Sequence, residues 1–377
     1  MNLSFQKLFF AIATVFSIFA ILILGKTILI PLGMALLISF ILFPLAKKFE
    51  SWRMSKIISA FLSILAVFIV IGGVIFFFST QIMGLSEEFS HFKEKILNVF
   101  AEVTLFVNNN LNFVPHLEKN ELLDQIKSWL NNSAGSLVKQ TFNSTASFAT
   151  GLLATIIFTF LILIYRDGLT RAFIAFSPDD KRENVLNMLK RIQKVGQKYL
   201  GGVILLIMIL GFANSIGLWI IGIDSPFLFG FLAAVMSIIP YVGTTIGASI
   251  PVFYAFMTHD SLWVPLVVAI LFWAIQLIDT NIISPKVLGS SMHVNALAAI
   301  LSLIIGASVW GIAGMILFLP FAAMLKVFCE EFESLRPISL LIGSQLYSGT
   351  DDNEKSRQKG LEKMKTRFLK IIKRSKK

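Results

Sequence analysis

Apolar residues run through this chain in long, uninterrupted blocks that are separated by shorter polar segments. Three of these blocks, Leu8–Leu24, Ile57–Phe78 and Val203–Ile221, contain no charged residue. About 20 apolar residues in a helix span the roughly 30 Å hydrocarbon core of a bilayer, and a helix that is apolar on every face is typical of membranes. We therefore predict an all-α, polytopic integral membrane helix bundle of about eight transmembrane spans, at residues 8–25, 27–46, 57–78, 148–165, 203–221, 226–257, 262–284 and 294–328.

The polar segments divide the chain into six regions, namely 1–79 with the first three spans, a polar region at 80–147, one span at 148–165, a charged segment at 166–200, the last four spans at 201–329, and a polar tail at 330–377. In the region 80–147, apolar residues from Leu85 to Phe106 are spaced alternately by four and three, which indicates a coiled-coil-type seam. A second amphipathic pattern follows Pro115. We predict a helical hairpin on the outer side, acting either as a lid on its own protomer or as a contact in a homo-oligomer.

The distribution of charge predicts the orientation in the membrane. The net charge is +11, and the basic residues gather after the second span, in 166–200 and in 355–377, whereas 80–147 carries five Lys and seven acidic residues. Cytoplasmic segments of membrane proteins collect Lys and Arg. We expect both termini and 166–200 to lie in the cytoplasm, 80–147 to lie outside, and the chain to reside in a bacterial-type inner membrane.

Two basic segments are also amphipathic. Residues 181–199 and 359–377 each place apolar side chains on one helical face and Lys or Arg around it. Such helices associate with anionic leaflets, at about 1 kcal/mol per basic residue. We predict contact with anionic membrane lipids there, and no nucleic-acid binding, because neither segment has the aromatic platform on which bases stack.

The spans at 226–257 and 294–328 are longer than an upright helix needs, and both contain helix-breaking residues: Pro240, Gly243, Gly247 and Pro251 in the first, and Gly306, Gly311, Gly314 and Pro320 in the second. Unpaired backbone is tolerated at membrane depth only against protein or water. In transporters, paired Gly/Pro-interrupted segments mark binding sites, because half-helix ends present free amides and carbonyls. The segments are therefore either broken, re-entrant helices at a site or ordinary kinked and tilted helices.

Polar residues inside the span 262–284 give a second indication of a site. Gln276, Asp279 and Asn281 lie within it, and an ionisable group at membrane depth must face a polar interior or find a partner. Lys286, seven residues after Asp279, is a candidate partner. The alternative is that Asp279 caps a helix end at the membrane surface.

Several classes of function are excluded by missing motifs. The sequence has no HExxH, no GxSxG and no GxxxxGK[ST], so zinc hydrolysis, serine esterase chemistry and ATP-driven transport lack their essential residues. Cys329 is the only cysteine, which excludes an intrachain disulfide and a multi-thiolate metal site. We expect no enzymatic activity, no cofactor and no metal.

Residues 225–320 carry a set of motifs, SPFLFGFLAAVMSIIPYVGTTIGASIP, QLIDTNIISPKVLG and GASVWGIAGMILFLP, that resembles the autoinducer-2 exporter (AI-2E) family of membrane proteins. The matching positions are Gly230, Ala233, Ile239, Pro240, Val242, Gly243, Asp279, Asn281, Pro285, Lys286, Gly289, Gly306, Gly311, Gly314 and Pro320. Two positions depart from the family pattern, since Thr244 and Asn295–Ala296 stand where many members carry Pro. The resemblance implies eight spans, oligomeric assembly and transport without an ATP motor. Some members are linked to export of autoinducer-2, and others resemble sodium(lithium)/proton antiporters.

Three hypotheses follow for the function. The first is an exporter or secondary transporter of a small polar solute, the second is a cation/proton antiporter that uses Asp279, and the third is a non-transporting oligomeric scaffold. The candidate transport-pathway or substrate-binding residues are Gln276, Asp279, Asn281, Pro240, Gly243, Gly247, Pro285, Lys286, Gly311 and Gly314.

Overall fold

The computed structural model describes residues 5–85, 148–239, 242–259, 261–289 and 294–343, and within these ranges the chain is helical apart from short turns and one isolated bridge between Val294 and Gly343. Six helical segments of the described part are long and apolar enough to cross a membrane by length and composition: Lys26–Ser51, Lys56–Gln81, Phe148–Ala175, Asp179–Ile221, Trp263–Leu288 and Ala296–Glu331, the last of which is interrupted at Gly311. Ile12–Leu24 and Pro226–Met236 are shorter apolar helices. The all-α membrane bundle is thus confirmed, whereas most of 80–147 and the tail beyond residue 343 lie outside the described residues.

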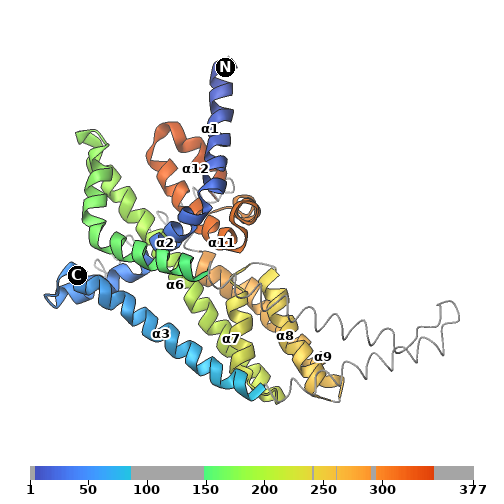
Figure 1. Cartoon of the computed structure of the whole chain (residues 1–377). Coiled ribbons are helices and arrows are strands. Elements are labelled where there is room, and N and C mark those ends of the chain that lie inside the picture. Colours follow the sequence, from blue (N-terminus) through green and yellow to red (C-terminus); the bar gives the residue numbers. More distant parts are fainter. Residues whose placement is uncertain (1–4, 86–147, 240–241, 260, 290–293, 344–377) are drawn as a thin grey trace, which may run out of the picture.

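The N-terminal part consists of α1 (Phe5–Leu24), α2 (Lys26–Ser51), α3 (Lys56–Leu85) and the helix Phe148–Ala175. Short turns join the first three helices (Figure 1). Their common core is a cluster of buried apolar side chains from α2, α3 and the fourth helix, namely Leu42, Ala46, Ala60 and Leu163. The apolar side chains on the outer surfaces of α1 and α3 are largely exposed, as expected for helices that contact lipid.

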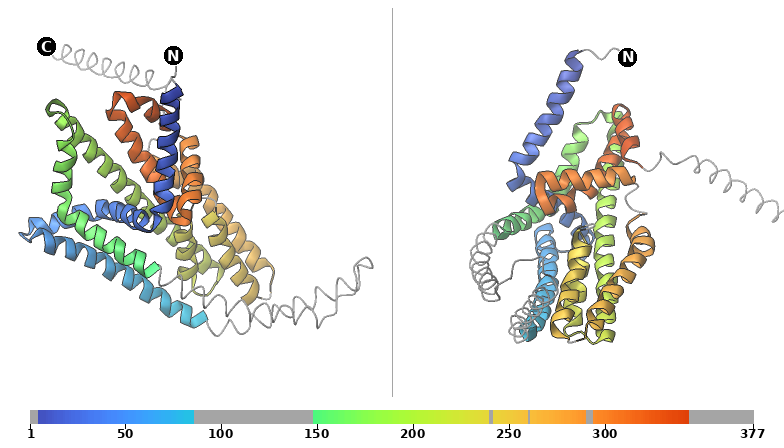
Figure 2. Two further views of the ribbon diagram at one scale, coloured as in Figure 1. Left: turned by 45° about the horizontal axis from the view of Figure 1, so that its top comes forward. Right: turned by 90° about the vertical axis from the view of Figure 1, so that its right-hand side faces the viewer.

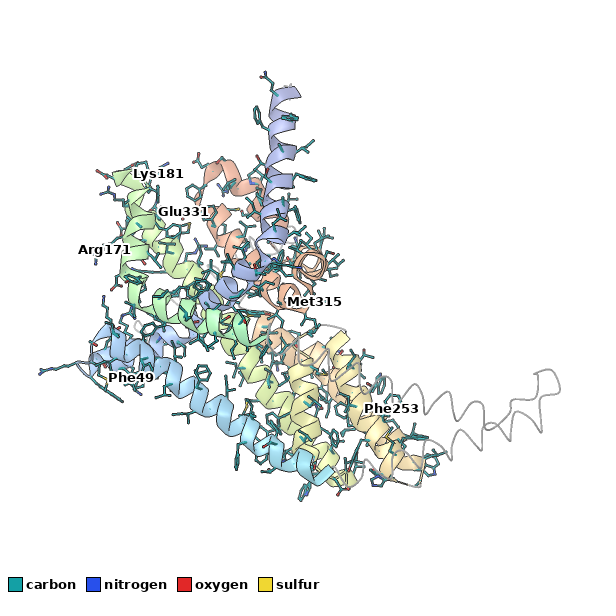
Figure 3. The ribbon with its side chains drawn as sticks, viewed as in Figure 1. Phe49, Arg171, Lys181, Phe253, Met315 and Glu331 are labelled. Atoms are coloured by element: carbon teal, nitrogen blue, oxygen red, sulfur yellow. The ribbon has the colours of Figure 1, made fainter. Side chains whose placement is uncertain are left out.

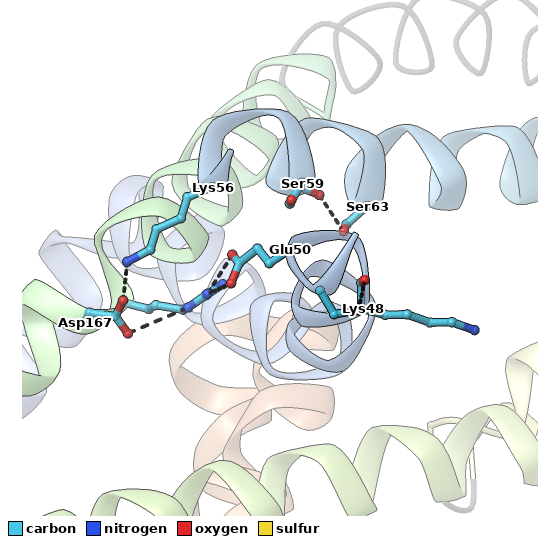
Figure 4. A network of polar contacts seen from close by, with 8 residues as sticks. Lys48, Glu50, Lys56, Ser59, Ser63 and Asp167 are labelled. Atoms are coloured by element: carbon cyan, nitrogen blue, oxygen red, sulfur yellow. Dashed lines mark hydrogen bonds and ion pairs between the residues drawn. The ribbon is translucent and has the colours of Figure 1, made fainter. Parts of the chain in front are cut away.

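A charged network ties this N-terminal part together at one end (Figure 4). Nη2 of Arg166 donates to Oε1 of Glu50 at 2.6 Å, which links the helix Phe148–Ala175 to α2. Asp167 pairs with Lys56 of α3 and lies 3.8 Å from Nε of Arg166. The side chains of Arg166 and Glu50 are only 15% and 21% exposed, so this pair is far less screened by water than a surface ion pair.

α6 (Arg182–Ile221) is a single 40-residue helix that unites the predicted amphipathic segment with the predicted span at 203–221. Val185 and Met188 of its apolar stripe pack against Val327, so protein and not lipid covers the stripe. Contact of 181–199 with an anionic leaflet would therefore depend on exposed basic side chains alone. Figure 3 shows that the labelled charged residues Arg171, Lys181 and Glu331 gather at the end of the molecule opposite Phe253; we call this the basic end.

The predicted span at 226–257 is broken into a hairpin of two helices, α7 (Pro226–Met236) and α8 (Val242–Thr258). The two arms run antiparallel and touch through backbone. A Cβ at Gly243 would lie 1.7 Å from the carbonyl oxygen of Met236, and one at Gly247 would lie 2.9 Å from Cα of Ala233. Since α7 rises only about 16 Å over its 11 residues, it is too short to cross a bilayer by itself.

A second hairpin lies within α11 (Ala296–Glu331), which reverses direction at Gly311 with φ +61° and ψ −137°. Only glycine adopts this backbone conformation without strain. Gly306 and Gly314 then meet backbone to backbone, and a Cβ at Gly314 would lie 1.9 Å from the carbonyl oxygen of Gly306. Both long, interrupted spans of the sequence are therefore hairpins and not tilted rods.

The first hairpin packs against α6 and α9 (Trp263–Ile278), whereas the second contacts α6 and α2. Both views of Figure 2 show α7, α8 and α9 bundled beside the later part of α6. Their core contains Leu218, Phe229, Ala233, Ala255 and Val268, each from α6, α7, α8 or α9. The start of α11 is fixed by Asn295, whose Oδ1 accepts from the Ala298 amide at 2.8 Å while its Nδ2 donates to the carbonyl of Leu341 in α12 (Arg336–Ile342) at 2.7 Å.

Candidate functional site

A cavity of about 410 Å³ lies between α6, the tip of the first hairpin, the segment after α9, and both arms of α11. Its polar wall comes from Gln276, Asp279, Thr280 and Ser284, and it is completed by the hydroxyl-bearing residues Tyr199, Ser237 and Thr244. Apolar side chains from α6 and α11, including Leu206, Ile300 and Leu303, line the remaining surface. The cavity therefore brings a band of hydroxyl, amide and carboxylate groups into an otherwise apolar surrounding.

The polar wall exists because the helix after α9 widens into two π-helical segments, η2 (Asp279–Ile283) and η3 (Pro285–Gly289). Pro285 has no N–H and its ring clashes with the preceding turn of an α-helix, so the backbone adopts a wider register beside it. The backbone N–H of Ser284 then donates to the carbonyl of Asp279 five residues earlier. Such π segments in helices are frequent at functional sites.

Side chains of this segment also donate to carbonyls of the preceding helical turn. The Thr280 hydroxyl donates to the carbonyl of Gln276, and Nδ2 of Asn281 donates to the carbonyl of Leu277 at 2.8 Å. Asn281 is accordingly occupied within its own helix and does not line the cavity. Its predicted place in the transport pathway stays a prediction.

Asp279 is the acidic residue of the cavity and is only 6% exposed. Its Oδ1 accepts a 2.7 Å hydrogen bond from the Ser284 hydroxyl. No basic side chain among the described residues forms an ion pair with it, and Lys286, the partner considered from the sequence, is exposed and does not contact it. A buried carboxylate with one neutral donor is costly in an apolar medium, so its retention points to a ligand or a proton as its missing partner.

The first hairpin brings helix ends to the cavity. Ser237 follows the last turn of α7, and Thr244 lies in the first turn of α8. Helix ends expose carbonyls and amides that the helix itself does not use, and an N-terminus carries a partial positive charge. Gly243 and Gly247 contribute by allowing the two arms to approach, not by lining the cavity. Pro240, between the two arms in the sequence, lies outside the described residues.

The second hairpin contributes differently from expectation. Gly311 and Gly314 form its turn and its backbone crossing, and the cavity is lined instead by Ala296, Ala299 and Ile300 of the first arm. Sequence analysis missed these alanines, and it missed Tyr199, which it treated only as part of the amphipathic stripe. The only available signal was that Tyr199 stands where the basic part of α6 passes into its uncharged part.

Comparison with known proteins decides the class to which this arrangement belongs. A family model described as "AI-2E family transporter" matches residues 8–334. The chain belongs to the AI-2E transporter family. Among its relatives are two Bacillus subtilis proteins: "Putative transport protein YrrI" is 28% identical over 82% of this chain and 88% of its own, and "Putative transport protein YueF" is 27% identical over 80% and 84%.

A third relative carries a substrate in its name. The Escherichia coli "AI-2 transport protein TqsA" is 23% identical over 84% of this chain and 89% of its own. Membership of a transporter family, together with six long apolar helices in the described part, makes this chain a multi-pass membrane transport protein. The family is one of transporters.

Proposed function

We propose that this AI-2E family protein moves a small, polar, uncharged solute across a bacterial inner membrane without hydrolysing ATP, through the cavity beside Asp279. The observation that carries the proposal is the meeting of a broken helix tip, a π-helical segment and one unpaired carboxylate at a single cavity. Autoinducer-2 is the first substrate to test, because the relative TqsA is named for it.

The chemistry of the cavity favours a neutral, hydroxyl-rich solute. A volume of about 410 Å³ is at the small end of ligand pockets, which suits a molecule of a few carbons with some water. The Tyr199 hydroxyl can both donate and accept hydrogen bonds, whereas the Ser237 and Ser284 hydroxyls, which already donate to Ala234 and Asp279, offer acceptor lone pairs. A solute with several hydroxyl or carbonyl groups would be matched by such groups, whereas a strongly charged solute would meet only one carboxylate.

Orientation and assembly belong to the same proposal. With the basic end facing the cytoplasm, both termini would be cytoplasmic and the cavity would lie deeper in the membrane. Because the sequence has no ATP-binding motif, the solute gradient or a coupling ion would drive transport. We expect a homo-oligomer in the membrane, with anionic lipid at its basic end.

The second candidate function is cation/proton antiport, because antiport requires a carboxylate that exchanges a proton for a metal ion and Asp279 is such a group. Proteoliposomes containing the purified protein test both functions, with autoinducer-2 or a small polyol as one probe and a sodium-driven proton flux as the other. Asp279→Asn should leave most of the solute flux and should abolish any antiport. Ile282→Ala, in the same segment but exposed and outside the cavity, is the matched control.

Three other results are informative. Loss of solute flux in Asp279→Asn, with normal flux in Ile282→Ala, would make the carboxylate itself part of solute binding. Antiport in the wild type without solute flux would replace the proposal by the antiporter. Absence of every flux in well-incorporated wild-type protein would favour a scaffold.

A further inference from the structure

A second pocket, lined by basic residues and separate from the cavity of Asp279, lies at the basic end between α2 and α6. It has a volume of about 500 Å³ and is lined by Lys47 and Lys48 of α2, by Lys190 and Lys194 of α6, and by two glutamines and two apolar residues, Gln193, Gln197, Phe43 and Pro44. Four lysines thus surround one opening, and they come from helices that are more than 130 residues apart in the chain. This juxtaposition could not be inferred from 181–199 alone.

The four positive charges of this pocket are not neutralised by the part of the chain that the structure describes. None of these lysines forms an ion pair with a described carboxylate. Glu50, the acidic residue of α2, binds Arg166, and Glu330 of α11 binds Arg191 of α6. Like charges that converge without a counter-ion repel one another, so an anion bound among them would stabilise the arrangement.

The depth of the pocket in the membrane indicates the source of that anion. Lys47 and Lys48 lie in the last turns of α2, an apolar helix of 26 residues that is long enough to span the bilayer. Phe43 and Pro44 lie one turn further into the membrane, and the ammonium of Lys47 is 5.9 Å from the centroid of the Phe43 ring. The pocket therefore has a cationic rim and an apolar floor, and with α2 spanning the bilayer this rim would face the lipid headgroups and this floor the first acyl carbons.

We propose that this pocket binds an anionic phospholipid, with its headgroup phosphate among Lys47, Lys48, Lys190 and Lys194 and its acyl chains starting against Phe43 and Pro44. Lysine ammoniums bind phosphate as point charges, and basic pockets between transmembrane helices hold anionic headgroups in this manner. The bound lipid would bridge α2 of the N-terminal part and α6, the helix that lines one side of the Asp279 cavity. This inference does not depend on the transported solute.

Native mass spectrometry of the full-length protein, released from detergent after addition of phosphatidylglycerol or phosphatidylcholine, tests the proposal. The wild type should retain phosphatidylglycerol in preference to phosphatidylcholine. Lys48→Gln combined with Lys194→Gln removes one charge from each helix and should weaken the apparent affinity about 30-fold, which corresponds to ~2 kcal/mol at 1.4 kcal/mol per tenfold.

The matched control is Lys181→Gln combined with Lys198→Gln, which removes two exposed charges of the same end outside the pocket. Equal losses in both double variants would show diffuse surface attraction and would overturn the site. Replacing Lys48 and Lys194 by Arg keeps the charge and should retain binding; a loss as large as that of the Gln variant, with an unchanged elution profile, would also contradict the proposal. Displacement of the lipid by inorganic phosphate as readily from the wild type as from the Gln variant would assign the pocket to soluble anions.

Discussion

Ser284 donates a 2.7 Å hydrogen bond to the carboxylate of Asp279, five residues earlier in the same helix. In a regular α-helix these two side chains would point away from each other, since neighbours on one face are three or four residues apart. The π-helical register of Asp279–Ile283 brings them together and turns both toward the cavity. The irregular backbone is therefore what creates a polar surface within an apolar span.

The first prediction concerns the strength of this pair. In a double-mutant cycle of Asp279→Ala and Ser284→Ala, an ionised carboxylate should give a coupling of about 1.5–3 kcal/mol, the range for hydrogen bonds to charged groups. Unfolding in mixed detergent micelles measures it. A coupling of about 0.6 kcal/mol, the average for hydrogen bonds between transmembrane helices, would instead indicate that the Asp279 side chain is protonated.

The second prediction tests whether the solute uses the cavity. Ala299→Trp places a large ring into the cavity from the first arm of α11, and solute flux in proteoliposomes should fall at least tenfold because the space for the solute is filled. Leu297→Trp is the control, since Leu297 is on the same helix but 68% exposed. Normal flux through the Ala299→Trp variant would move the pathway elsewhere.

The third prediction concerns the crossing of the second hairpin. Gly314→Ala would place a methyl group 1.9 Å from the carbonyl oxygen of Gly306, so backbone must shift, and we expect destabilisation of about 3 kcal/mol or more. Gly201→Ala is the control, because nothing lies within 4 Å of a Cβ there and alanine favours a helix by about 1 kcal/mol. Thermal unfolding in detergent should separate the two variants clearly, and equal melting temperatures would contradict the observed crossing.

The fourth prediction compares two ion pairs at the basic end. Arg166→Gln leaves Glu50 without its cation in a part-buried position and should destabilise the protein by about 2–4 kcal/mol. Arg182→Gln removes the pair with Asp179, whose side chains are 52% and 85% exposed, and should change stability by less than ~1 kcal/mol. Added salt should reduce the effect of Arg182→Gln and leave most of the effect of Arg166→Gln, because exposed pairs are screened more strongly than part-buried ones. A salt series in an unfolding assay measures both effects.

Much of the architecture could be predicted because membranes impose simple rules. Charge-free blocks such as Ile57–Phe78 can satisfy their backbone in hydrocarbon only as helices, so composition alone determined the all-α class. The same reasoning located both broken segments from their Gly and Pro residues. It could not decide between kinked rods and hairpins, because that choice depends on backbone contacts such as Gly306 with Gly314, which are 8 positions apart in sequence and adjacent only after the turn at Gly311.

The candidate site divides in the same way. Asp279 and Gln276 were recognisable because polar residues at membrane depth are costly and therefore conspicuous in an apolar span. Tyr199, Ser237 and Ala299 carry no such signal, since a single hydroxyl or methyl group is tolerated on any helix face, and the fold alone brings them to one cavity. The sequence by itself determined which segments enter the membrane and where a charge is buried. Tertiary structure decided what surrounds that charge, because the direction of each helix face is set by packing between segments distant in the chain.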